Sequence, residues 1–183
     1  MEYTLSFIAG LIAMIFVVSS YFLKNKKLYL FSQGLGIVFL IISFFFISEF
    51  FATVGLVVGL LRCLVYFLYE EKGKTAPIFF ALCFSVMTVA VYFIVNVAVL
   101  KTNKPADIIN LAALIGYAFA TRIPNFRLMR WVALIPNVLS LTYCVVIAAT
   151  PFVITSYFFE LSANVFSIWK NRRTNEKNLL SKE

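Results

Sequence analysis

A helix-length apolar run from Pro151 to Arg173 carries polar side chains at regular spacing. Steps of four, four and three residues separate Ser156, Glu160, Asn164 and Ser167, so one face of a helix would carry all of them. An ionised glutamate facing lipid would cost several kcal/mol. We therefore expect the Glu160 carboxylate to face protein, water or a cation.

Arg62 is the cation that the sequence offers at comparable depth. Gly55, Gly59, Arg62 and Tyr66 follow at steps of four, three and four residues, so they share one helical face. Two glycines at this spacing allow close helix packing. We predict that Arg62 and Glu160 interact directly or share one buried polar network. The alternative is that Arg62 extends to the nearer membrane interface.

Further polar side chains in apolar segments complete a candidate site for a small polar solute. Amides both donate and accept hydrogen bonds, and Pro136 would kink its helix beside Asn137. Polar contacts that only join helices are an equally simple explanation. The predicted substrate-binding residues are Arg62, Glu160, Asn164, Asn137, Gln33, Tyr66 and Asn110.

Residues for catalysis or metal binding are scarce in the chain. There is no histidine, which removes the commonest metal ligand and the usual proton shuttle. Asp107 is the single aspartate, and Cys63, Cys83 and Cys144 fall in apolar segments without metal-ligand spacing. We expect neither an enzyme nor a bound metal or cofactor.

The composition is that of an integral membrane protein in contact with lipids. Hydrophobic residues make up 62% of the 183 residues and charged residues 13%, against about 45–50% and about 25% in soluble domains. The net charge of +8 comes from short basic runs between apolar segments. This distribution is typical of topology signals and not of a nucleic-acid-binding surface.

Seven apolar segments predict an all-α, polytopic membrane helix bundle. The fifth is short and is interrupted by Asn110 and Gly116, so a tilted helix and a re-entrant segment are both open. We expect residues 171–183 to form a short polar tail that is disordered or fraying. The predicted spans are 4–23, 28–47, 50–69, 76–100, 106–121, 128–149 and 151–173.

Positive charge predicts the orientation of these spans. With the N-terminus outside, 13 of the 16 Lys and Arg residues lie on the cytoplasmic side, and only Lys101 and Lys104 lie outside. A model that omits the fifth span separates the basic runs onto opposite sides. The positive-inside rule therefore favours a multi-pass protein with its C-terminus in the cytoplasm.

When the chain is aligned with itself at an offset of 100 residues, its two halves share a layout of spans and basic loops. This predicts an internal repeat in a 3+1+3 arrangement. The alternative is that any two three-helix stretches of similar length align loosely. The matched pairs are Lys27 and Arg127, Gly36 and Pro136, Ser43 and Tyr143, and Tyr69 and Trp169. The predicted units are a triple-helix unit (1–73), a connector (74–104), a second triple-helix unit (105–173) and the tail (174–183).

This layout resembles that of the SWEET sugar transporters and the PnuC vitamin transporters. Nearly the whole chain is most similar to the YgjV family of small bacterial inner-membrane proteins. The motifs are Leu60-Leu61-Arg62, Arg127-Leu128-Met129-Arg130-Trp131, and Phe159-Glu160 with Asn164 and Trp169-Lys170. The resemblance implies a bacterial inner membrane location but no activity, and the chain lacks the Pro-Gln dipeptides of related carriers.

Two functions from different classes fit this sequence. The first is a transporter or binder of a small polar solute, with its site between the two repeats. The second is a non-transporting subunit or docking platform, with a homo-oligomer or a cytoplasmic protein partner. Its basic cytoplasmic face would bind anionic lipid or an acidic partner, unless these residues only set topology. That face comprises Arg122, Arg127, Arg130, Arg172 and Arg173.

Overall fold

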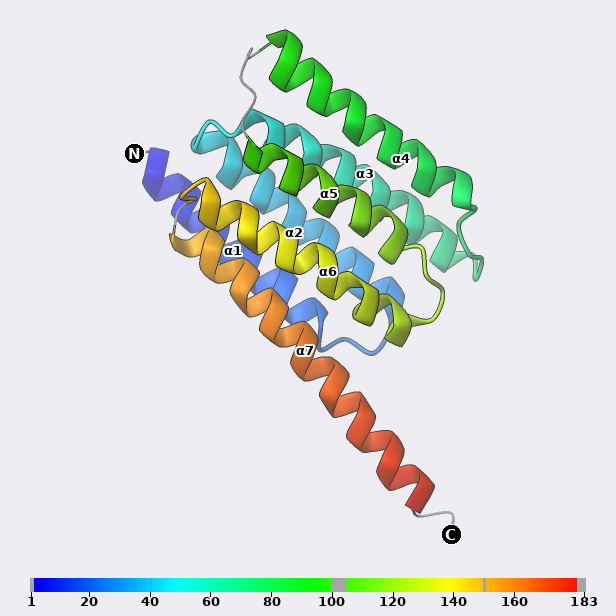
Figure 1. Ribbon diagram of the computed structural model, residues 1–183. Coiled ribbons are helices and arrows are strands. Elements are labelled where there is room, and N and C mark those ends of the chain that lie inside the picture. The colour runs from blue at the N-terminus through cyan, green and yellow to red at the C-terminus, as the bar shows by residue number, and fades with distance from the viewer. Residues whose placement is uncertain (1, 100–104, 150, 181–183) are drawn as a thin grey trace.

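The computed structural model describes residues 2–99, 105–149 and 151–180 of the chain. Helices account for all the regular structure in these ranges (Figure 1), which confirms the predicted all-α fold. The helices are α1 (Glu2–Ser20), α2 (Lys26–Phe46), α3 (Phe50–Glu71), α4 (Ile78–Tyr92), the π-helix η1 (Phe93–Val99), α5 (Pro105–Ala120), α6 (Phe126–Val146) and α7 (Pro151–Leu180).

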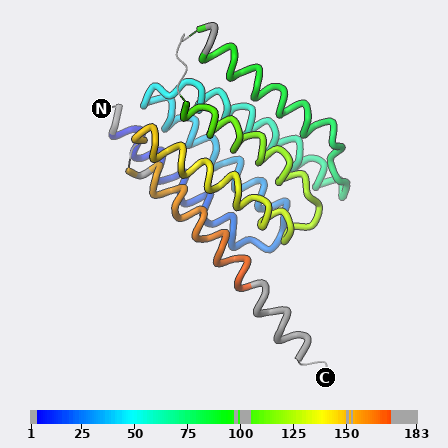
Figure 2. The backbone as a smooth tube through the Cα atoms, viewed as in Figure 1, coloured from blue at the N-terminus to red at the C-terminus, as the bar shows by residue number. Residues whose placement is uncertain are grey.

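Six of the helices form a closed ring. Going round it, α1 packs on α2, α2 on α3, α3 on α5, α5 on α6, α6 on α7, and α7 on α1. Helix α4 lies outside the ring against α3 and α5, and the trace in Figure 2 shows it along the outer edge of the bundle. The ring places side chains from both halves of the chain around one centre.

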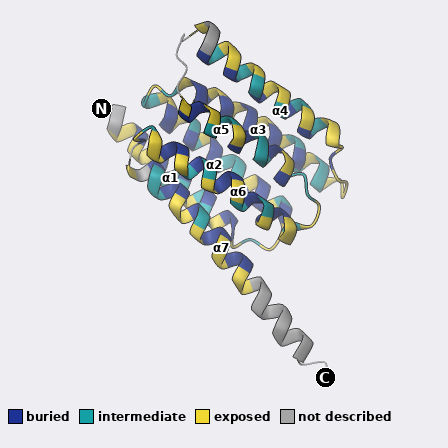
Figure 3. Ribbon diagram, viewed as in Figure 1, coloured by how far each residue is buried: buried dark blue, intermediate teal, exposed yellow. Residues whose placement is uncertain are grey.

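The outer surface of the bundle is apolar. Figure 3 shows exposed positions along the outer sides of the helices and buried positions between them. Many exposed side chains are large hydrophobics, such as Phe79 and Ile135, which are 64% and 66% exposed. Lipid contact accounts for this pattern, because a soluble protein rarely exposes such a large apolar surface.

Within the described residues, four helices are long and apolar enough to cross a membrane by themselves: α2, α3, α6, and α4 together with η1 as far as Asn96. The apolar part of α1 (Thr4–Ser20) and α5 are shorter. The 16 residues of α5 span about 24 Å at 1.5 Å per residue, less than the hydrocarbon core of about 30 Å. Helix α5 is nevertheless continuous through Asn110 and Gly116.

Helix boundaries recur with a shift of 100 residues. Helices α2 and α6 begin at residues 26 and 126, and Asn25 and Asn125 cap them by accepting backbone N–H groups. Both helices end with a left-handed residue, Ser48 at φ 59° and Ala148 at φ 50°. The N–H groups of residues 49 and 149 bond to the carbonyls of residues 44 and 144, a Schellman ending in both cases. These matches favour the repeat, and the 3+1+3 arrangement stays a prediction.

A buried polar contact joins the connector helix to the ring. Asn96 in η1 donates to Asp107 Oδ2 at 2.7 Å, and the two side chains are 1% and 2% exposed. Asp107 lies in the first turn of α5, where the helix dipole also favours a carboxylate.

Helix α7 continues to Leu180, whereas we expected residues 171–183 to be disordered or fraying. No glycine or proline interrupts residues 171–180, and basic residues near a helix C-terminus are favourable.

Candidate functional site

The centre of the ring contains a cavity of about 50 Å³, lined by side chains from all six ring helices and none from α4. Four of the seven predicted substrate-binding residues line it: Gln33, Arg62, Asn110 and Glu160. Gln33 and Arg62 come from the first half of the chain, and Asn110 and Glu160 come from the second.

A chain of polar contacts links Glu160 to the opposite side of the ring. Tyr21 OH donates to Glu160 Oε1 at 2.7 Å, and Asn137 Nδ2 donates to Tyr21 OH at 3.2 Å. Tyr117 OH donates to Asn137 Oδ1, and its ring faces the Arg62 guanidinium at 5.5 Å. Both predicted charges thus belong to one polar network, although no described ion pair joins them.

Arg62 is held by backbone and aromatic groups. Its Nη1 donates to the Leu114 carbonyl at 3.2 Å, and one turn along α3 Tyr66 OH donates to the Ala118 carbonyl at 2.9 Å. Arg62 is 6% exposed, so it does not extend to the interface. The predicted glycine face of α3 packs on α5, because a Cβ at Gly55 would lie 2.6 Å from Leu114 Cδ1. Tyr66 therefore joins α3 to α5 and does not line the cavity.

The predicted polar face of α7 is confirmed, since Ser156, Glu160, Asn164 and Ser167 are all buried. The face contacts two neighbours. Ser156 and Glu160 bond to α1 and to the turn that follows it, whereas Asn164 Nδ2 donates to the Arg130 carbonyl at 3.1 Å and Ser167 accepts from the Arg130 guanidinium. Asn164 thus belongs to the end of the bundle and not to the cavity.

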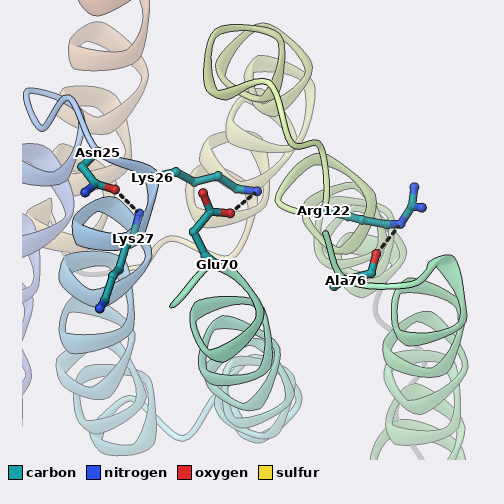
Figure 4. Close-up of polar contacts among 6 residues, drawn as sticks. All are labelled: Asn25, Lys26, Lys27, Glu70, Ala76 and Arg122. Atoms are coloured by element: carbon teal, nitrogen blue, oxygen red, sulfur yellow. Dashed lines mark hydrogen bonds and ion pairs between the residues drawn. The ribbon is translucent and has the colours of Figure 1, made fainter. Parts of the chain in front are cut away.

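The arginines predicted to form a basic face differ in exposure. Arg127 is exposed, Arg122 is half-buried and Arg130 is buried. Arg122 Nε donates to the Ala76 carbonyl at 3.0 Å, joining two loops (Figure 4). The side chains of Arg172 and Arg173 lie outside the described residues.

Two acidic residues partly neutralise the same end of the bundle. Lys26 Nζ lies 3.1 Å from Glu70 Oε2, as Figure 4 shows, and Lys27 Nζ lies 2.8 Å from Glu71 Oε1. Only Lys26 is buried in these pairs, so the exposed pair contributes little stability.

Two tyrosines of the network were missed by the sequence analysis. Tyr21 lies near the end of the first predicted span, and Tyr117 lies near the end of the fifth, where a tyrosine is typical of the membrane interface. Yet Tyr21 is fully buried. Only a helical projection that placed Tyr21 with Ala13 and Val17 on the buried face of the first segment could have indicated this.

The polar groups at this site are suited to hydrogen bonding. Carboxylate, guanidinium, amide and phenol groups surround the cavity, and no group of three potential metal ligands occurs in the described parts of the chain. The site can hold a small polar molecule or water by hydrogen bonds and charge.

An apolar bundle with a buried polar centre defines an integral membrane protein. A model of the Imp-YgjV family, described as bacterial inner membrane protein, matches residues 4–175. The chain belongs to this family, which confirms the resemblance and makes it a multi-pass protein of the bacterial inner membrane. Searches of curated proteins and of solved structures found no match.

Proposed function

We propose that the protein binds a small polar solute in the central cavity and moves it across the membrane without changing it chemically. The observation that carries this proposal is the cavity itself, with Gln33, Arg62, Asn110 and Glu160 converging from four ring helices. Ionisable side chains at such depth are costly, and in membrane proteins they mark solute and ion pathways.

The size of the cavity implies that the described conformation is closed. One water requires roughly 10–15 Å³ by this measure, so about 50 Å³ holds a few water molecules. Pockets for small molecules usually exceed about 300 Å³. Solute entry therefore requires the ring to open, and the boundary between the two predicted units, α3 with α5 and α1 with α7, is where we expect the movement.

Uptake into proteoliposomes tests this function. The full-length protein is reconstituted and screened with labelled sugars, amino acids, vitamins and nucleosides. Tyr157 lines the cavity, so Tyr157→Phe should raise the KM for the transported solute. Tyr69 does not line it and packs on Phe80, so Tyr69→Phe, the same chemical change, should leave uptake unchanged. Folded protein that takes up nothing across the panel would favour the non-transporting alternative.

A further inference from the structure

A second pocket lies at the basic end of the bundle, where α1 ends and α6 begins. Its volume is about 330 Å³, within the range of small-molecule pockets and far larger than the central cavity. Three of its lining residues are basic, Lys24, Arg130 and Lys170, and none of its lining residues among those that the structure describes is acidic.

Arg130 forms the buried wall of this pocket. It is 3% exposed, and its Nη2 donates to the Leu23 carbonyl at 2.7 Å while its Nη1 donates to Ser167 Oγ. The guanidinium also lies 4.1 Å from the centre of the Phe126 ring. These contacts fix its position, but Nε has no hydrogen-bond partner and no described carboxylate forms an ion pair with Arg130. A buried cation that lacks a counter-charge among the described side chains favours binding of an anion.

The other cations and the aromatic residues indicate which anion fits. Lys24 and Lys170 both line the pocket and are exposed, so their side chains lie at its mouth. Phe22, Phe166 and Trp169 form a contiguous exposed aromatic group beside it, which is typical of the headgroup level of a membrane.

We propose that this pocket binds a phosphate group, with Lys24 and Lys170 at its mouth and Arg130 at its base. The phosphate could be carried by an anionic lipid headgroup or by a soluble phosphate, since both present the same anionic oxygens. This site is separate from the central cavity and does not depend on the transport proposal.

Thermal unfolding of the purified full-length protein in a neutral detergent tests the proposal. Short-chain phosphatidylglycerol, glycerol 3-phosphate and inorganic phosphate are titrated separately, with phosphatidylcholine as the lipid control. We expect a saturable rise in Tm with at least one phosphate compound that phosphatidylcholine does not give. A rise with phosphatidylglycerol alone identifies a lipid headgroup, whereas a rise with the soluble phosphates as well identifies a site for free phosphate.

Charge variants locate the binding. The double variant Lys24→Gln/Lys170→Gln should weaken the apparent Kd by about tenfold or more, since each basic residue near a membrane surface contributes about 1 kcal/mol. The control is Lys72→Gln/Lys74→Gln, which removes the same charge at the same end but outside the pocket, and should leave Kd within about twofold. If both double variants weakened the apparent Kd equally, or if no phosphate compound gave a saturable rise in Tm, the proposal would be overturned.

Discussion

Tyr21 supplies a buried hydrogen bond to Glu160. Tyr21 OH donates to the carboxylate at 2.7 Å, and both side chains are nearly inaccessible. A buried acceptor without its donor costs about 1–3 kcal/mol. Tyr21→Phe and Glu160→Leu should each lower the free energy of unfolding in detergent, and their double-mutant cycle should give a coupling of about 1 kcal/mol or more.

The control for this cycle is Tyr66→Phe combined with Glu160→Leu. Tyr66 bonds to the Ala118 carbonyl, so its coupling to Glu160 should be below about 0.5 kcal/mol. The coupling energy between Arg62→Leu and Glu160→Leu should lie between the values for the Tyr21 and Tyr66 cycles. The reason is that Tyr117, Asn137 and Tyr21 separate the two charges. Coupling as small for Tyr21 as for Tyr66 would show that the network does not stabilise the fold.

The sequence was sufficient to predict that the polar face of α7 is buried, but not which residues its side chains contact. Spacing alone placed Ser156, Glu160, Asn164 and Ser167 on one buried face, because helical periodicity is local. The partner of Arg62 is the Leu114 carbonyl, and a backbone acceptor leaves no mark in the residue types. Asn164 lies on the buried face of α7, as predicted. It contacts α6 near one end of the bundle, however, and not the cavity.

At the scale of helices, the shared endings of α2 and α6 carry strain. Ala148 has a φ of 50°, and a non-glycine residue in the left-handed region costs about 1–2 kcal/mol. Glycine avoids this cost but loses more entropy on folding, about 0.5–1 kcal/mol. Ala148→Gly should therefore raise the free energy of unfolding by up to about 1 kcal/mol in denaturation by detergent or heat.

Ala149→Gly is the matched control. Ala149 does not have a positive φ, so this substitution should lower the free energy of unfolding. Helix α3 has the same type of ending, because the Lys74 N–H bonds to the Tyr69 carbonyl. Its left-handed residue is a glycine, Gly73 at φ 63°, as this preference predicts. Destabilisation by Ala148→Gly equal to that by Ala149→Gly would show that the left-handed ending carries no strain.

At the same scale, hydropathy predicted the existence of the helices better than their lengths. The interruptions at Asn110 and Gly116 made the fifth segment ambiguous, yet α5 is one helix. A Cβ at Gly116 would lie 3.2 Å from Pro136 Cβ, so this glycine permits close packing of α5 on α6. Close packing between helices depends on a partner distant in sequence and cannot be read from one segment.

For the whole molecule, the predicted seven crossings would place the two termini on opposite sides of the membrane. The prediction rests on the bias of Lys and Arg toward one side. Alkaline phosphatase and fluorescent protein fusions, made after residue 183 and within residues 101–104, should report a cytoplasmic C-terminus and an outer loop. Reporters on the same side at both positions would rule out seven crossings.

The central claim is that the cavity opens to water, and Cys63 provides a direct test. Cys63 lines the cavity, whereas Cys144 is equally buried but lies outside it. Two single-cysteine proteins retain one or the other: Cys83→Ser/Cys144→Ala keeps Cys63, and Cys63→Ala/Cys83→Ser keeps Cys144. Each is reconstituted in liposomes and treated with a charged, membrane-impermeant methanethiosulfonate.

The measurement is the labelling rate of Cys63 relative to that of Cys144. A ring that opens should expose Cys63 transiently, so we expect it to react faster than Cys144 and to be protected by a transported solute. A Cys63 that is as unreactive as Cys144 from both sides of the membrane, in protein that remains folded, would contradict the account.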